Sequence, residues 1–422
     1  MPVGDLSTSV VARFERAIAY ARSLPDQAIG LSVSGGGDSI ALMHLAARIR
    51  DPKQLHILTV DHGLRPEAKE EVALVASQAA MLGIEYDVTQ WVWDGNGNLQ
   101  AAARAGRWDA LRDWARKQNL DEIWVGHTED DQLETALMRL ARGSGIDGLS
   151  AMYPLTRRDG ARVLRPLLGV SRDELRAWLT SEKIAWCDDP SNQDPRFDRV
   201  RARQMFAQLE ALGLTRKRLL QTIDHMQAAV VSLQAAAAAF ARLHVRQDTG
   251  DLLFFPQALD LETADVPRRV MAAGLGWVAS RSYRPRFEQM LETVAQARAG
   301  ATVTLGGCIL MPEGGGTVRL TREAAGTTAI SPQMPTDRDV LWDQRWELKG
   351  RQTGGLTFKA LGEGIKDCPD WRDSGMPRAS LLASPSVWEK ETLLAAPVAG
   401  LRNGWSARIV TDFHTSAFAI ED

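Results

Sequence analysis

The sequence predicts an α/β fold: a doubly wound parallel sheet, followed by a mainly helical region and a small α+β region. Between about residues 28 and 179, short apolar runs alternate with longer segments of helical periodicity, which is typical of repeated βαβ units. Helical periodicity dominates after residue 200, and Trp- and Gly-rich runs follow residue 339. Because 422 residues are too many for one core, we expect two or three domains.

The first half contains the expected strands and helices in alternation. The apolar runs expected as strands are 28–34, 55–61, 86–93, 122–127 and 161–168. An amphipathic helical pattern precedes them, and further helical patterns begin at Ile40, Pro66, Leu99, Glu129 and Ser171. In such a sheet the carboxyl ends of the strands open onto one crevice, where we expect the chemistry.

The second half predicts two further domains. We place the first domain at residues 1–214 and a mainly helical one at 215–323, whose alternating Gly-interrupted end predicts a small antiparallel sheet. Residues 324–338 have linker composition, and 339–422 predict a small α+β domain. Its tryptophans fit either a core or a docking surface for a partner.

Composition restricts the class of protein. The net charge is −3, and no run reaches the roughly 18 consecutive apolar residues of a spanning helix. The start lacks the pattern of a signal peptide, so we expect a cytoplasmic protein. Cys187, Cys308 and Cys368 form no C-x-x-C pair, which argues against a disulfide framework or zinc site. Residues 196–218 hold seven basic against two acidic residues, a local basic cluster.

A glycine-rich loop, SGGGDS, lies between the first expected strand and its helix. Glycines allow positive φ and close backbone approach, so N–H groups can point at phosphate oxygens, and the helix N-terminus adds its dipole. The alternative is that Asp38 or Ser39 only caps a helix after a tight turn. The loop residues are Ser34, Gly35, Gly36, Gly37, Asp38 and Ser39.

The loop has no lysine and carries an aspartate instead. A carboxylate beside a polyphosphate repels it unless a cation lies between them, so Asp38 implies Mg²⁺ as a bridge. Such a loop suits expulsion of pyrophosphate from ATP, with AMP transferred to an acceptor.

A second polar group follows the fourth expected strand. Asp131 and Glu134 are three residues apart and share one face of the expected helix, close to His127. Thr128 and Asp131 also form a capping-box pattern, which gives the aspartate a purely structural alternative. Glu134 lies beyond the first turn and would face the same crevice as the loop.

These motifs resemble a known family. SGGGDS resembles the loop of the PP-loop, or N-type, ATP pyrophosphatases, whose fold is of the adenine-nucleotide α-hydrolase type. Together with GHTEDDQLETAL at 126–137, DHGLRPEA at 61–68, RPLLGVSRDEL at 165–175 and DDPSNQDPRFDRVRAR at 188–203, it resembles the tRNA(Ile)-lysidine synthase family. The resemblance implies that ATP adenylates the C2 oxygen of the wobble cytidine in an isoleucine tRNA with a CAU anticodon. Free L-lysine then displaces AMP through its ε-amine.

The resemblance also implies site residues. It places Ser34 to Ser39 on ATP, Asp38 on Mg²⁺ and Arg107 near the nucleotide phosphates, with His127, Asp131 and Glu134 at the lysine and cytidine end. Arg199 matches a family arginine, whereas Val200 stands where many members have asparagine. The base that deprotonates lysine stays open between His127 and a carboxylate. The basic cluster would contact tRNA phosphates, and a homodimer is possible.

Three other functions are alternatives to this interpretation. A tRNA thiolase needs cysteines near the active site, and an amidotransferase needs a glutaminase cysteine or a partner that supplies one. A non-catalytic, nucleotide-dependent RNA-binding protein is the third, and pyrophosphate release that depends on tRNA and lysine would exclude it.

Overall fold

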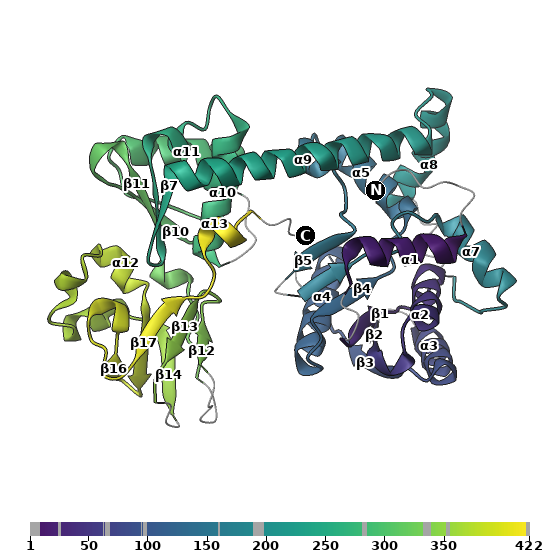
Figure 1. Cartoon of the computed structure of the whole chain (residues 1–422), viewed down its shortest axis with the longest axis horizontal. Helices are drawn as coiled ribbons and strands as arrows, with labels where there is room; N and C mark the ends of the chain where they lie inside the picture. Colours follow the sequence, from purple (N-terminus) through teal and green to yellow (C-terminus); the bar gives the residue numbers. More distant parts are fainter. Residues whose placement is uncertain are drawn as a thin grey trace. The chain divides into compact units, whose positions relative to one another are not determined.

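The computed structural model divides the chain into two compact units, one up to Val230 and one from Val231 onward (Figure 1). The domain boundaries near residues 214 and 323 remain predictions. The residues that the structure describes are 9–23, 27–61, 63, 68–93, 95, 99–158, 161–188, 198–280, 285–331, 339–351 and 355–418.

A six-stranded sheet forms the centre of the first unit and confirms the predicted α/β fold. Its order is β3-β2-β1-β4-β6-β5, and all neighbours pair in parallel except β5 and β6. The sequence analysis missed β5, a short edge strand. The strands are β1 (Ile29–Ser32), β2 (Leu55–Asp61), β3 (Glu85–Gln90), β4 (Glu122–Val125), β5 (Leu155–Arg158) and β6 (Ala161–Leu164).

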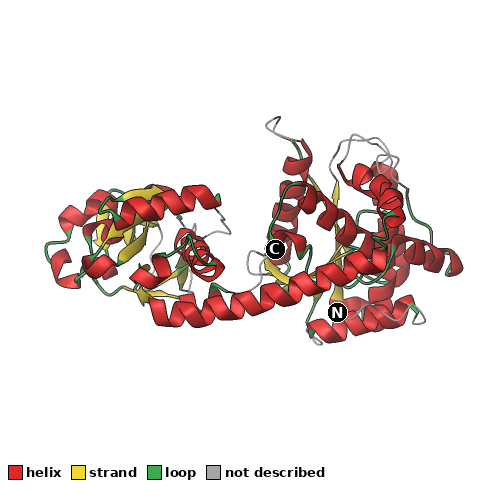
Figure 2. Ribbon diagram, turned by 90° about the horizontal axis from the view of Figure 1, so that it is seen from above, coloured by secondary structure: helices red, strands yellow, loops and turns green. Residues whose placement is uncertain are grey.

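Helices cover this sheet with two separate apolar cores, as expected of a doubly wound fold (Figure 2). One core joins residues of α1, α2, α3 and α7 to β1 and β2. The other joins Trp108, Leu111 and Trp114 of α4 to residues of β2, β4 and β6. The helices are α1 (Val10–Ala21), α2 (Gly37–Ile49), α3 (Ala68–Leu82), α4 (Leu99–Lys117), α5 (Glu129–Ala141), α6 (Ile146–Leu149), α7 (Arg172–Ser181) and α8 (Asp198–Ala211).

Helix α9 (Arg216–His244) begins in the first unit and ends in the second. Its Ile223 packs with Leu133 of α5, and the Gln227 amide donates to the Ser150 and Met152 carbonyls. Among the described helices, α9 alone is long and apolar enough to span a membrane by length and composition. Helices of proteins outside membranes meet the same criterion, so it is weak evidence of a membrane segment.

The second unit starts with a five-stranded sheet of order β7-β8-β11-β10-β9, covered by α10 (Asp265–Ala279) and α11 (Phe287–Arg298). The predicted small antiparallel sheet is present in β9 to β11. The expectation that the region from about Thr215 to Arg298 is helical was wrong at β7 and β8, a hairpin whose turn residue Thr249 has φ +58°. The strands are β7 (Val245–Asp248), β8 (Asp251–Phe254), β9 (Val303–Leu305), β10 (Cys308–Pro312) and β11 (Val318–Arg322).

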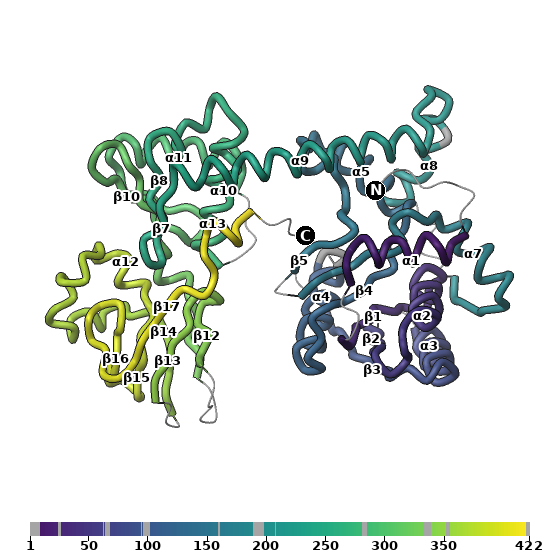
Figure 3. The backbone as a smooth tube through the Cα atoms, in the orientation of Figure 1, coloured from purple at the N-terminus to yellow at the C-terminus, as the bar shows by residue number. Residues whose placement is uncertain are grey.

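Two three-stranded sheets form the C-terminal part of the second unit (Figure 3). Trp342, Trp346 and Trp405 are buried in their shared core, so these tryptophans pack internally. The elements are β12 (Val340–Trp342), β13 (Trp346–Lys349), β14 (Leu356–Ala360), α12 (Arg378–Leu382), β15 (Pro385–Glu389), β16 (Thr392–Ala395), β17 (Ser406–Ile409) and α13 (Phe413–Ser416).

We predict that Gly30→Ala destabilises the first unit. A Cβ at residue 30 would lie 2.7 Å from the Trp114 ring and 3.3 Å from Leu120, so the core of α4 would have to shift. Overpacking of this kind costs about 1–3 kcal/mol, which chemical denaturation can measure. Gly169→Ala is the control, because its Cβ meets nothing within 4 Å. Equal stability of the two variants would contradict the prediction.

Candidate active site

The glycine loop connects β1 to α2 and is held in place from two sides. Gly35 has φ +93°, and its carbonyl accepts a hydrogen bond of 3.0 Å from the Cys187 amide. The Ser39 hydroxyl donates to the Gly36 carbonyl at 2.9 Å and accepts from the Ser34 amide at 3.1 Å. Helix α2 starts at Gly37, so its first N–H groups have no partners within the helix. This arrangement can bind phosphate oxygens.

The second polar group lies beside this loop because β4 pairs with β1 in parallel. The chain leaves β4 through Gly126, where a Cβ would lie 3.2 Å from the Asp38 carbonyl carbon and oxygen. The start of α2 and the residues before α5 therefore touch through backbone atoms. The structure thus brings Asp38 to the same edge of the sheet as His127, Asp131 and Glu134.

Asp131 uses its two carboxylate oxygens for different purposes. Oδ2 accepts from the Thr128 amide at 2.9 Å and from the Thr128 hydroxyl at 3.0 Å, which is the predicted cap. Oδ1 lies 2.7 Å from Arg172 Nη2 and 3.7 Å from Arg199 Nη1. The capping role of Asp131 is therefore compatible with its predicted role in the active site.

Glu134 is almost fully buried, with a side chain that is 1 % exposed. Its Oε1 accepts from Arg172 Nη1 and from Arg203 Nη2, both at 2.8 Å. Its Oε2 is also buried and has no hydrogen-bond partner among the described residues. A buried carboxylate oxygen without a partner is unfavourable, and a cationic group of a ligand would satisfy it.

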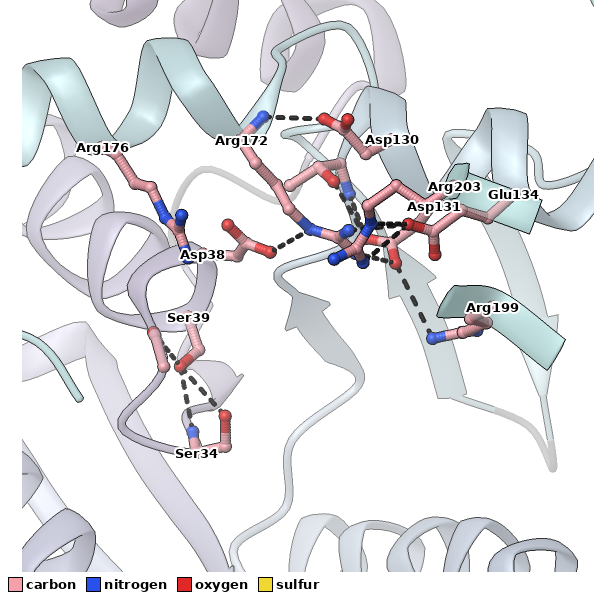
Figure 4. Close-up of polar contacts among 12 residues, drawn as sticks. Ser34, Asp38, Ser39, Asp130, Asp131, Glu134, Arg172, Arg176, Arg199 and Arg203 are labelled. Atoms are coloured by element: carbon pink, nitrogen blue, oxygen red, sulfur yellow. Dashed lines mark hydrogen bonds and ion pairs between the residues drawn. The ribbon is translucent and has the colours of Figure 1, made fainter. Parts of the chain in front are cut away.

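Arg172, the first residue of α7, is the functional candidate that the sequence analysis did not single out. Its guanidinium contacts three carboxylates, with Nε 3.1 Å from Asp38 Oδ2 and the two Nη atoms on Asp131 and Glu134. Figure 4 shows it between Asp38 and the acidic residues of α5. These carboxylates outweigh burial and raise the pKa of Arg172 above its ordinary value. The only signal in the sequence was its place in the segment 165–175.

The pKa values of the carboxyl groups respond to burial and to this arginine. Burial raises the pKa of Asp38 from 3.8 to about 6, although Arg172 acts in the opposite direction. Burial also raises the pKa of Asp131, but Arg172, His127 and Arg199 outweigh it, and the net pKa is lowered. Burial therefore dominates the pKa of Asp38, whereas the neighbouring cations dominate that of Asp131.

His127 and Arg107 each present a buried nitrogen without a partner. His127 Nδ1 and Arg107 Nε are both buried and make no hydrogen bond within the described part of the chain. Burial lowers the pKa of His127, so its imidazole is neutral at physiological pH. Burial, Arg104 and Arg199 lower the pKa of Arg107 to about 10. The predicted position of Arg107 at the nucleotide phosphates stays a prediction.

Three arginines of the basic cluster lie within ion-pair distance of acidic residues at the start of α5. Arg203 contacts Glu134, and Arg216 contacts Glu129 and Asp130, both at 3.0 Å. Arg199 approaches Asp131. Val200 is buried, so this position contributes packing in α8. The described residues do not include 189–197, and with them Arg196, or most of the segment 61–68.

Cys187 lies beside the glycine loop, with its amide on the Gly35 carbonyl. Burial and the acidic groups of Glu71, Glu70 and Asp188 raise the pKa of its thiol, which disfavours the reactive thiolate. Cys308 and Cys368 lie in the second unit, and all three cysteines are free. This environment does not suit thiolase chemistry.

Comparison with known proteins identifies the family. The PP-loop domain model matches residues 7–210. A tRNA(Ile)-lysidine synthase of Ruegeria pomeroyi is 43% identical over 400 residues, which cover 93% of this chain and 94% of that protein. The chain belongs to the tRNA(Ile)-lysidine synthase family.

Two other members of the tRNA(Ile)-lysidine synthase family match more distantly. The enzyme of Wolbachia pipientis wMel is 31% identical, over 87% of this chain and 88% of its own length. That of Methylobacterium nodulans is 36% identical, over 72% of this chain and 90% of its own length. The resemblance inferred from the motifs is confirmed, and so is ATP as a ligand of the PP-loop family. The roles of individual site residues remain predictions.

We predict that Asp38→Asn stabilises the ligand-free protein at pH 7.5. The folded protein keeps the Asp38 proton up to about pH 6, whereas the unfolded chain loses it near pH 3.8. Stability therefore falls as pH rises through this window, and the full cost of the charge is present above pH 6. Removing the charge should stabilise the fold by about 1–3 kcal/mol in EDTA at pH 7.5.

Denaturant unfolding of both proteins at pH 7.5 and at about one pH unit below the unfolded-state pKa of 3.8 measures this effect. The difference should vanish at the lower pH, where Asp38 is protonated in both states. Asp109→Asn is the control, because Asp109 forms only an exposed pair with Arg112 on α4. A destabilised Asp38→Asn at pH 7.5 would count against a raised pKa.

Proposed function

We propose that this chain joins free L-lysine to C2 of the wobble cytidine in an isoleucine tRNA with a CAU anticodon, with ATP as the adenylating substrate. The observation that carries this proposal is the placement of a glycine-rich phosphate loop and a buried acidic pair at one edge of the sheet. The loop suits the triphosphate, and the acidic pair suits an amine. Membership of the lysidine synthase family supports the same reaction.

In the first step, the cytidine O2 attacks the α-phosphorus of ATP, and pyrophosphate leaves. The loop would hold the phosphates with backbone N–H groups at the start of α2, where the helix dipole favours negative charge. Ser34 is exposed and its hydroxyl lies 3.2 Å from that of Ser39, so one hydroxyl can turn toward a phosphate. The ring oxygen is a poor leaving group, and adenylation converts it into one that leaves as part of AMP.

Asp38 is the residue that would hold Mg²⁺, together with phosphate oxygens. Burial raises the pKa of this carboxyl group although Arg172 contacts it, and a bound cation would favour its charged form. Within the described residues no group of three potential metal ligands occurs, and Mg²⁺ commonly uses one or two carboxylates plus substrate phosphates. When bound, Mg²⁺ would neutralise charge that develops on the phosphates.

In the second step, the lysine ε-amine attacks C2 of the cytidine, AMP leaves, and the amine loses a proton. Asp131 and Glu134 would hold the ammonium groups of lysine, and Glu134 Oε2 offers a buried acceptor without a partner. Neutral His127 can accept a hydrogen bond or a proton from the amine, and the carboxylates are the alternative base. Arg199 and the neighbouring basic residues would contact tRNA phosphates. A homodimer and a cytoplasmic location complete the proposal.

Lysine incorporation into tRNA tests this function. We expect ATP, labelled lysine and an isoleucine tRNA transcript with CAU to give labelled tRNA and one pyrophosphate per lysine. A methionine tRNA with the same anticodon is the control and should stay unlabelled. Label in both tRNAs would remove the proposed discrimination, and absence of label in the isoleucine tRNA would remove the function.

We predict that Glu134→Gln raises the lysine KM at least about 10-fold and leaves the ATP KM within about 2-fold. Loss of one charged partner for an ammonium costs about 1.5–3 kcal/mol, which corresponds to a change of this size. Steady-state kinetics with each substrate varied in turn measure both constants. Glu129→Gln, in the same helix and paired with Arg216, is the control. An equal rise in both KM values would indicate that Glu134 maintains the structure of the whole site and does not bind lysine specifically.

A further inference from the structure

Arg172 links the two halves of the site through one guanidinium group. Its Nε lies 3.1 Å from Asp38, at the loop that suits ATP, and its Nη atoms lie 2.7 and 2.8 Å from Asp131 and Glu134. The three carboxylates come from two helices, α2 and α5, and the guanidinium comes from a third, α7. Each substrate end of the site is therefore in contact with the same cation.

The two halves depend on this cation to different degrees. Within the described residues, Asp38 has no ion-pair partner besides Arg172. Asp131 has Arg199 in addition, at 3.7 Å, and Glu134 has Arg203 at 2.8 Å. Asp38 thus becomes unpaired as soon as Arg172 moves, whereas the acidic pair of α5 keeps other cations.

The position of Arg172 allows the side chain to move while its backbone stays fixed. Its backbone amide donates to Asp130 Oδ2 at 2.8 Å. Ser171 and Glu174 form a capping box around it at the start of α7. The side chain, in contrast, has several rotatable bonds, and its contacts within the described residues are charge-assisted hydrogen bonds to three carboxylates.

We propose that Arg172 is a positioning residue that couples the binding of Mg²⁺–ATP to the binding of lysine. In the ligand-free protein Arg172 is the shared counter-ion of both halves. When Mg²⁺–ATP occupies the loop, Asp38 turns to the metal and Arg172 loses one of its three carboxylates. Its hold on Asp131 and Glu134 weakens, and the ammonium of lysine displaces it there. This inference rests on the proposed lysidine synthase function.

The charge balance favours such an exchange over simple addition. A guanidinium and Mg²⁺ on the same carboxylate would repel each other at short range. Glu134 Oε2 is covered by protein in the ligand-free state, so an ammonium reaches it only if a neighbouring side chain moves. One movement of Arg172 meets both requirements.

Calorimetry of the full chain tests this coupling. Lysine is titrated with and without Mg²⁺ and α,β-methylene-ATP, an analogue that resists cleavage at the bond broken in the reaction. For the unaltered protein we expect the analogue to tighten lysine binding by about 5- to 150-fold, the usual range of coupling between two sites. By reciprocity, lysine should tighten binding of the analogue by the same factor.

Arg172→Met removes the shared cation and keeps side-chain length. We expect lysine to bind this variant more tightly without nucleotide, and the coupling to fall to within about 2-fold. Arg176→Met is the matched control one turn further along α7, because Arg176 is exposed and pairs with Asp188. It should keep the full coupling. If Arg172→Met does not fold by circular dichroism, Arg172→Lys serves, and its compact ammonium should reduce the coupling.

Three outcomes would overturn the proposal. They are an unaltered protein without coupling, an Arg172 variant with full coupling, and an Arg172 variant whose only defect is weak nucleotide binding. The last would make Arg172 a phosphate ligand. The incorporation assay distinguishes failure of this proposal from failure of the proposed function. A chain that makes lysidine but fails the coupling tests keeps its proposed function and loses only this role of Arg172.

Discussion

The parallel pairing of β1 with β4 is the constraint on which the site depends. The two strands end side by side, and each leads directly into a helix that begins at the same edge of the sheet. The glycine loop before α2 and the acidic start of α5 are thereby neighbours, although about 90 residues separate them in the chain. Had another strand lain between β1 and β4, the loop and the acidic pair would be too far apart to act on one substrate.

This proximity creates an electrostatic difficulty that the arginines of two other helices relieve. Asp38, Asp131 and Glu134 all contact one cation, and burial disfavours the charged forms of Asp38 and Asp131. Arg172 from α7 and Arg203 from α8 compensate part of this charge. Asp38 receives the least compensation, which is the state expected of a group whose partner is a ligand. This difference is consistent with the proposed Mg²⁺ site at Asp38.

Much of this arrangement could be predicted from the sequence. The alternation of apolar runs and helical segments predicted the parallel sheet, and the glycines predicted the loop. Because such a sheet places the ends of its strands at one edge, it followed that Asp38 would lie near His127, Asp131 and Glu134. The capping pattern of Thr128 and Asp131 was also visible, and the structure shows that one carboxylate oxygen serves the cap while the other faces Arg172.

Other features could not be predicted from one sequence. The reach of Arg172 across three helices depends on side-chain rotamers and on the packing of α7, which periodicity does not encode. Contact of the basic cluster with tRNA remains a prediction, and the pairing of Arg203 and Arg216 with carboxylates of α5 could not be inferred from the sequence. The strands β5 and β7 have the sequences LTRR and VRQD, with one apolar residue each, so no apolar run marks them.

The contact between Gly126 and the Asp38 backbone sets the spacing of the site through main-chain atoms alone. Side chains around it can therefore change the charge and shape of the pocket without changing the distance between its two ends. The charge and shape of the pocket are therefore independent of the distance between its two ends, although these properties are often linked in enzymes. Under the proposed function, substitutions at Asp131 and Glu134 would change the accepted amine, while the backbone would keep the geometry of the adenylation step.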